Sequence, residues 1–346
     1  CLVGSEMCIR DRVIAAFVIM QILINAGEIS SLFQGLMVPL CTYIILAISL
    51  NLVVGILGEL SLGHAGFMCV GAFTSSFFSK AMQDTITNST VRFLLALLIG
   101  IITAAIFGII IGIPVLRLNG DYLAIVTLAF GEIIKNLVNV LFIGKDSKGF
   151  HFSTKDAVSL NMEPDGKIIL NGPQGITGTP NDSTFFIGFI LILVTLFIVL
   201  NLIHSRDGRA IMAIRDNRIA AESIGINITK YKLMTFTISA AMAGAAGVLY
   251  AHNLSNLTAN TNNFGYNMSI NILVFVVLGG IGNIRGSIIA AVVLTLLPEL
   301  LRGMSDYRML IYAIVLIVMM LFNWAPKAIE WREKHLSFKK NKKEAA

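Results

Sequence analysis

Long apolar runs, separated by shorter polar segments, repeat along the chain from residue 13 onward. A helix that crosses a membrane needs about 20 mostly apolar residues. The runs that are long enough are Gly35–Leu57, Val91–Val115, Tyr122–Ile143, Thr184–Ile203 and Leu233–Tyr250. The shorter runs are Val13–Leu23, Ser61–Phe78, Ser269–Gly279, Ser287–Leu300 and Met309–Phe322. The pattern predicts an all-α, polytopic helical membrane protein with about ten membrane segments, some of them short or re-entrant.

The composition excludes a soluble globular enzyme. Of the 346 residues, 56% are hydrophobic and 13% are charged, whereas a soluble domain has roughly 25% charged residues. The four cysteines make no disulfide framework, and Cys41 and Cys69 lie inside apolar runs as small core residues. Residues 1–12 do not continue the apolar pattern, so we interpret them as a truncated or foreign start.

The positions of Lys and Arg predict the orientation, because cytoplasmic loops retain these residues. The loop His204–Lys232 contains six of them, and the tail 326–346 contains seven. Four segments separate the two clusters, which places both on the cytoplasmic side. We therefore expect a membrane domain over 13–325 with both ends cytoplasmic, an exterior loop at 144–183 and a cytoplasmic loop at 204–232.

The cytoplasmic loop contains the signals of a short helix. Asp216 or Asn217 can cap it, and Gly225 stands just past its expected end. The helix is too short to span a membrane. An apolar side and projecting charges suit a surface helix docked by a cytoplasmic partner. The apolar side comprises Ile211, Ile214, Ile219 and Ile224, and the charges are Arg215, Arg218 and Glu222. The alternative is an ordinary basic loop resting on the membrane.

Two glycine-rich polar stretches interrupt apolar runs, at 58–67 and 279–286. Irregular backbone at membrane depth occurs only inside protein or beside a water-filled cavity, and broken helices often form the binding sites of transporters. The candidate path residues are Ser61, Gly63, His64, Gly66, Phe67, Gly279, Gly280, Gly282 and Asn283, with Phe67 and Phe275 as wall residues. The alternative for both stretches is a tight turn with close helix packing, and a histidine such as His64 more often bonds between helices.

Glu132 and Lys135 are charges inside the predicted span Tyr122–Ile143. A bare charge there costs roughly 2.5–3.5 kcal/mol on insertion scales. The i, i+3 spacing allows the two residues to pair with each other. We expect a structural ion pair in preference to a role in a permeation path.

Several enzyme signatures are missing from the chain. It has no G-x-x-x-x-G-K-[ST] loop for a nucleotide and no H-E-x-x-H, G-x-S-x-G or C-x-x-C pattern. Hydrolytic or redox chemistry therefore has no visible apparatus, and neither a metal nor a cofactor is expected. The remaining signals favour a transporter that is not itself an enzyme.

Several stretches together resemble the LivM-type permease subunit of bacterial ABC importers for branched-chain amino acids. They are LSLGHAGF at 60–67, LRLNGDYLAIVTLAFGEI at 116–133, GPQGITGTP at 172–180, GRAIMAIRDNRIAAESIGINITKYK at 208–232 and VLGGIGNIRGSIIAA at 277–291. The resemblance implies an inward transporter of leucine, isoleucine and valine in the bacterial plasma (inner) membrane. Its implied partners are a second homologous permease of the LivH type, two ATP-binding subunits, an extracytoplasmic substrate-binding protein and membrane lipid, with no nucleic acid.

The resemblance also implies which residues couple ATP hydrolysis to transport. Ala220, Ala221, Glu222 and Gly225 match the segment that the ATPases contact in this family, and we assign Arg215 and Asp216 of the same cytoplasmic loop to the coupling site with them. Three alternatives stay open. A related permease could carry urea or a short amide, a secondary transporter could couple solute to ions through Glu132 or Glu299, and the chain could be a structural or channel-like scaffold.

Overall fold

The computed structural model describes residues 31–83, 85–116, 122–146, 149–162 and 166–301, with isolated positions at 13, 17, 20–21, 310, 313–314, 317–318 and 321. Its helices are α2 Ser31–Asn51, α3 His64–Ala81, α4 Ser89–Val115, α5 Tyr122–Val140, α6 Phe185–His204, α7 Arg206–Asp216, α8 Arg218–Ser223, α9 Ile228–Ala251, α10 Thr261–Phe264, α11 Tyr266–Gly279 and α12 Ile284–Leu300. The predicted spans Val13–Leu23 and Met309–Phe322, the doubtful start at 1–12 and the basic tail lie wholly or mostly outside the described residues.

The structure is mostly helical, as predicted, and five of its helical stretches are long and apolar enough to cross a membrane. They are Phe33–Leu57, Ser89–Val115, Tyr122–Val140, Phe185–His204 and Ile228–Ala251. These bounds agree closely with the five long runs expected from the sequence. Length and hydropathy alone therefore locate the main spans of this chain.

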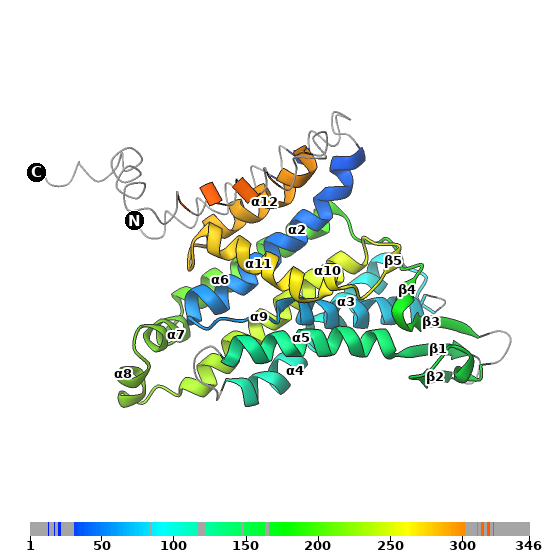
Figure 1. The fold of residues 1–346 in the computed structure, drawn as a ribbon, viewed down its shortest axis with the longest axis horizontal. Coiled ribbons are helices and arrows are strands. Elements are labelled where there is room, and N and C mark those ends of the chain that lie inside the picture. Colours follow the sequence, from blue (N-terminus) through cyan, green and yellow to red (C-terminus); the bar gives the residue numbers. More distant parts are fainter. Residues whose placement is uncertain are drawn as a thin grey trace, which may run out of the picture.

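Helix α9 lies at the centre of the bundle and packs against α2, α3 and α4 (Figure 1). Small residues allow this close approach: a Cβ on Gly71 of α3 would overlap the carbonyl of Gly244, and one on Gly247 would overlap the carbonyl of Met68. Membrane helices associate through such small residues because lipid supplies no hydrophobic drive between them. The glycines of α3 and α9 thus fix the core of the subunit.

The first long helix does not stay α-helical to its end. After Asn51 it continues as the π-helical segment η1, Leu52–Leu57, and it stops at Gly58, which has a left-handed φ of +80°. Wide turns of this kind disturb the regular pattern of backbone hydrogen bonds and occur often at functional sites. No sequence signal predicts the π-helix, because its apolar residues continue those of α2.

The prediction of an all-α fold is wrong in detail, because the structure also contains a three-stranded sheet and a two-stranded sheet, formed mostly by the predicted exterior loop. Strand β1 (Phe142–Asp146) pairs antiparallel with β2 (Gly149–Ser153) and β3 (Lys167–Asn171), and β4 (Ile176–Thr177) pairs with β5 (Asn256–Leu257). Helix α5 ends at Val140, so the predicted span to Ile143 was too long. The apolar residues that extended it belong to β1.

The ends of the bundle differ in architecture. The strands gather at one end, whereas α7 and α8 project at the opposite end (Figure 1). We call these the strand end and the α7–α8 end. Two short 3₁₀ turns, Val158–Leu160 and Gly172–Gln174, complete the strand end. Any signal that passes between the two ends must travel through the helices.

Candidate functional site

The short helix expected in the basic loop is present as α8. The side chain of Asn217 caps it by accepting a hydrogen bond from the Ala220 N–H at 3.0 Å. Beyond its last turn Gly225 has a φ of +86°, and the Ile226 N–H donates to the Ala221 carbonyl at 3.1 Å. A left-handed glycine followed by this backward bond is a strong helix stop. The capping prediction is confirmed, with Asn217 rather than Asp216 as the cap.

The predicted apolar side of this loop is divided between two helices. Ile211 and Ile214 belong to α7, a helix that the sequence reading missed, and both are buried. On α8, by contrast, Ile219 is 81% exposed and Ile224 is 74% exposed, and Glu222 is exposed between them. The expectation of one continuous apolar side is therefore wrong. Helix α7 anchors the loop to the bundle through its buried isoleucines, and the two isoleucines on and just after α8 are exposed on the surface.

Arg215, at the end of α7, connects the helix pair to the π-helical segment. Its Nη1 donates to the carbonyl of Gly55 at 2.8 Å, and its aliphatic stem fills the space where Gly58 has no side chain. Close by, Lys232 of α9 forms an ion pair with Glu59. These groups line a cleft of about 400 Å³ together with Leu57, Ile214 and Arg218. The α7–α8 pair is thus attached to the π-helical segment through Arg215, beside the ion pair between Lys232 and Glu59.

Asn51 connects the same segment to the second glycine-rich stretch. Its Oδ1 accepts from the Gly282 N–H at 2.9 Å, and its Nδ2 donates to Ser287 Oγ at 3.0 Å. The side chain of Asn51 is fully buried. Gly282, with a φ of +82°, lies so near Gly55 that a Cβ on Gly55 would overlap its backbone. A chain of contacts therefore runs from Arg215 through Gly55 to the turn between α11 and α12.

The first glycine-rich stretch lies inside the subunit. Ser61, Gly63, His64, Gly66 and Phe67 are all buried. The imidazole Nε2 of His64 is 2.9 Å from Ser239 Oγ, which in turn donates to the Ser49 carbonyl at 2.5 Å. Such bonds between helices match the alternative reading of His64 as a structural histidine.

Helix α5 covers that stretch on one side. The Leu62 N–H donates to Thr127 Oγ1 at 3.1 Å, and a Cβ on Gly66 would lie 2.7 Å from Gly131 Cα. The second stretch has a different environment, with Gly279, Gly280 and Gly282 half-buried and Asn283 exposed. Phe275 is buried. The predicted wall residues Phe67 and Phe275 therefore do not reach the surface of the subunit.

The expected ion pair between Glu132 and Lys135 is present on α5. Lys135 Nζ also donates to Thr261 Oγ1 at 3.2 Å, and Glu132 Oε1 accepts from the Tyr266 N–H at 2.9 Å. Tyr266 is the first residue of α11, so the carboxylate stabilises the positive end of that helix dipole. The pair thus fixes the start of α11 against the side of α5.

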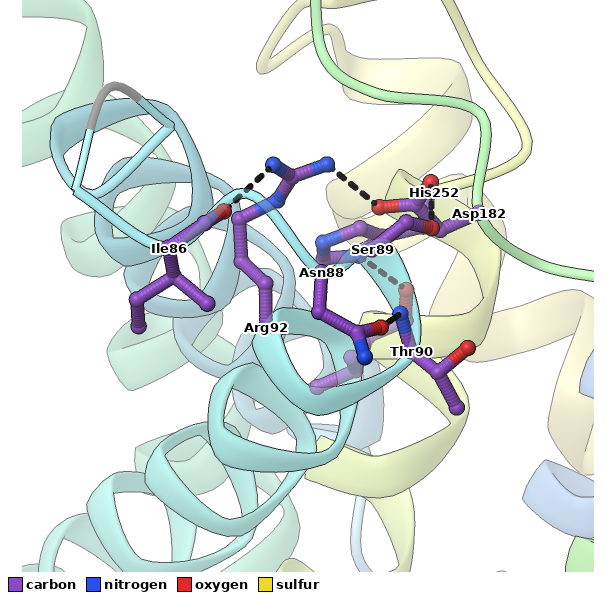
Figure 2. A network of polar contacts seen from close by, with 8 residues as sticks. Ile86, Asn88, Ser89, Thr90, Arg92, Asp182 and His252 are labelled. Atoms are coloured by element: carbon purple, nitrogen blue, oxygen red, sulfur yellow. Dashed lines mark hydrogen bonds and ion pairs between the residues drawn. The ribbon is translucent and has the colours of Figure 1, made fainter.

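A polar network at the strand end was missed by the sequence reading (Figure 2). Buried Arg92 of α4 donates from Nη2 to Asp182 Oδ2 at 3.1 Å and from Nη1 to the Ile86 carbonyl at 3.3 Å. Ser89 Oγ donates to the other oxygen of Asp182 at 2.8 Å. The network connects the start of α4 to the segment before α6. No spacing rule connects residues 90 positions apart, so only the fold shows it.

His252, directly after α9, lies against this network and is fully buried. Its Nδ1 is 3.0 Å from the Val248 carbonyl, and its ring meets Phe93 edge-on. Burial lowers the pKa of His252 below its ordinary value of 6.5, against the smaller opposing effects of the Val248 carbonyl and the Asp182 charge. The imidazole is therefore neutral at pH 7.

Among the described residues, no group of three His, Cys, Asp or Glu side chains is placed to hold a metal ion. The long apolar helices define the class of the protein: a mostly helical, multi-pass membrane protein.

The family follows from the sequence profile that matches residues 32–322, described as "Branched-chain amino acid transport system / permease component". The chain belongs to this family. It is 35% identical over 296 residues to the high-affinity branched-chain amino acid transport system permease protein LivM of Salmonella typhimurium, a match that covers 83% of the chain and 67% of LivM. The LivM protein of Escherichia coli K12 matches with the same identity and coverage.

More distant relatives cover most of the chain. The permease protein LivH of Salmonella typhimurium is 26% identical, over 81% of this chain and 89% of LivH. The fructose import permease protein FruG of Bifidobacterium longum is 25% identical, over 88% of this chain and 85% of FruG. No solved structure matches. The chain is thus a permease component of a branched-chain amino acid ABC transport system and a homologue of bacterial inner-membrane permeases.

Proposed function

We propose that this chain is the LivM-type half of a heteromeric importer that moves leucine, isoleucine and valine into the cell. A LivH-type permease completes the membrane core, and two separate subunits hydrolyse ATP at the α7–α8 end. An extracytoplasmic substrate-binding protein delivers the amino acid at the strand end. Identity to the LivM proteins supports the assignment of this half, because the LivH match is weaker. The two basic clusters support a cytoplasmic α7–α8 end and cytoplasmic termini.

The observation that carries the proposal is the exposed helix α8, which is connected to the core through α7 and the Arg215 bond to Gly55. Ile219, Glu222 and Ile224 point away from the bundle and offer an apolar and charged grip to an ATP-binding subunit. Movement of α8 pulls on α7, and Arg215 transfers the pull to the Gly55 carbonyl. We propose that the π-helix and the turn at 280–283 respond together, since Asn51 and Gly55 contact both.

The test compares two arginines of α7 in vesicles that contain the whole importer. Arg215→Gln removes the bond to Gly55, whereas Arg209→Gln removes a surface residue whose Nη1 contacts the adjacent His204 carbonyl at 3.3 Å. A hydrogen bond to a charged group contributes about 1.5–3 kcal/mol. The low end of that range corresponds to about a tenfold loss of transport per ATP.

We expect Arg215→Gln to hydrolyse ATP with about one tenth of the uptake per ATP and Arg209→Gln to match the wild type. The complex must remain assembled, which co-purification of its subunits checks. Equal uptake per ATP in both variants would contradict the coupling route.

The other readings make different predictions for the same vesicles. A urea or short-amide permease would accumulate those solutes and not leucine, and the similarity to FruG is the reason to include fructose among the controls. An ion-coupled transporter needs a titratable carboxylate, yet Glu132 is engaged by Lys135 and by the start of α11. We therefore expect uptake to survive an uncoupler and to stop without ATP.

A further inference from the structure

The membrane helices expose two kinds of surface. Every exposed residue in the middle of α4 and α6 is apolar. On α4 they are Leu94, Leu95, Leu98, Ile102, Ile106, Ile109 and Ile110, and on α6 they are Phe186, Ile190, Val194, Phe197 and Ile198. Lipid tails solvate such side chains without cost, so this surface suits the bilayer.

The exposed surface of α5 and α11 has a different composition, and we call it the α5–α11 face. Its members are Tyr122, Ile125, Ala129, Ile133, Asn136, Leu137 and Val140 on α5, and Tyr266, Ile270 and Asn271 on α11. The α5 residues recur every three to four positions and form one stripe. Helices α5, α10 and α11 contact one another, and Figure 1 shows them side by side. Two carboxamides, together with the hydroxyl groups of Tyr122 and Tyr266, therefore stand on a surface that is otherwise apolar.

The position of α11 places one of these carboxamides deep in the membrane. Glu132 binds the first N–H of α11, and Glu132 is eight residues before the end of α5. At a rise of about 1.5 Å per residue, α11 begins roughly 12 Å below the strand end of α5. Asn271 is five residues further along α11. It therefore lies roughly 20 Å below that end, inside a hydrocarbon core about 30 Å thick.

Contact between this face and lipid would be energetically unfavourable. An amide group moved from water into hydrocarbon without a hydrogen bond costs roughly 4–8 kcal/mol. The side-chain carboxamides of Asn136 and Asn271 have no hydrogen-bond partner among the described residues. The Glu132 side chain is 26% exposed at the edge of the same face. Polar groups at membrane depth face other protein segments or a water-filled cavity.

We propose that the α5–α11 face is the surface on which the second, homologous permease subunit docks, with the translocation path between the two subunits. The proposal deepens the proposed function and depends on it. The partner supplies the protein and enclosed water that Asn136 and Asn271 need, and the apolar stripe of α5 offers room for branched side chains. Lipid covers the α4 and α6 surfaces.

This placement changes the part played by the first glycine-rich stretch. Gly63 and Gly66 pack against the back of α5, at Thr127 and Gly131. A solute on the α5–α11 face meets α5 and does not reach His64 or Phe67. The stretch then positions α5 relative to the core, and a shift of α3 changes the width of the path.

The test uses a photo-crosslinking amino acid at four exposed positions in the purified complete importer. Ile133 and Ile270 probe the proposed face, and Ile106 and Val194 are matched controls on α4 and α6. All four are exposed aliphatic residues on membrane helices. Mass spectrometry identifies what each position captures. We expect the second permease from the first two positions and lipid from the controls.

Other outcomes separate the two proposals. Capture of lipid alone at Ile133 and Ile270, in a complex whose subunits co-purify, overturns the docking face and leaves the proposed function standing. Capture of another copy of this chain at Ile133 or Ile270 refutes the claim that the docking partner is a distinct, homologous permease. Failure of the chain to co-purify with any second permease refutes the proposed function itself. As a second readout, Asn271→Cys in a background without native cysteines should react with a water-soluble thiol reagent, and Ile106→Cys should not.

Discussion

The glycine pair between α3 and α5 provides a quantitative test of how the core supports the α5–α11 face. Gly66 and Gly131 face each other, but a methyl group on Gly66 would lie 2.7 Å from Gly131 Cα and 3.2 Å from a ring carbon of Phe130. A methyl group on Gly131 would find its nearest neighbour, Gly66 N, at 3.7 Å. Ordinary carbon contacts are about 3.5–4.0 Å. Gly66→Ala must therefore push the helices about 1 Å apart, whereas Gly131→Ala fits.

Both substitutions gain the same helix propensity, but only Gly66→Ala introduces a steric overlap between α3 and α5. Alanine improves helix propensity over glycine by about 1 kcal/mol in either helix. Overpacking costs about 1–3 kcal/mol. We expect Gly66→Ala to lose up to about 2 kcal/mol of stability and Gly131→Ala to be neutral or up to about 1 kcal/mol more stable.

The assay is thermal unfolding of both purified variants in one detergent, followed by loss of the monodisperse peak in size-exclusion chromatography. Gly131→Ala should unfold at the same temperature as the wild type or at a higher one. Gly66→Ala should unfold at the lowest temperature of the three proteins. If Gly131→Ala unfolds at a lower temperature than Gly66→Ala, the described packing of α3 on α5 is wrong.

Three further experiments test separate parts of the structure. Gly225→Val places a β-branched residue at φ +86°, so it should distort the α8 stop and reduce uptake per ATP while the chain still reaches the membrane in a fractionation assay. Lys135→Met leaves the Glu132 charge bare and should lower the unfolding temperature more than the double variant with Glu132→Gln, because an unpaired charge costs more than a lost pair. For His252, burial holds the pKa below 6.5, so the unfolded chain takes up a proton first and stability falls as the pH drops below about 6.5. His252→Gln should lose less in unfolding temperature between pH 7.5 and 5, and an equal loss in both proteins would refute this role.

The sequence predicted the long helices well, because twenty apolar residues in succession leave little choice of structure. It also predicted the capped helix α8 and the ion pair on α5, since Asn217, Gly225 and the i, i+3 spacing are local signals. The strands were missed because β1, β2 and β3 have five residues each, and β1 continues the apolar run of α5. Helix α7 was missed because its charged residues resemble an ordinary basic loop.

Contacts between distant segments left no local signal in the sequence. Asn51 meets Gly282 across 231 positions, and Arg215 meets Gly55 across 160. Gly58 and Gly282 belong to stretches that indicated a turn or close packing, but they could not indicate which helix approaches, and Gly55 gave no signal inside its apolar run. The connection from α8 to the second glycine-rich stretch is therefore visible only in the structure. It places the proposed movement at the π-helix and at the turn 280–283.

The most direct test of the central claim is uptake of labelled leucine into vesicles that contain this chain, a LivH-type permease, the two ATP-binding subunits and the substrate-binding protein. We expect accumulation that requires ATP, persists with an uncoupler and stops when this chain is omitted. Leucine uptake that needs no ATP and collapses with the uncoupler would contradict the account, as would accumulation of urea or fructose in place of leucine.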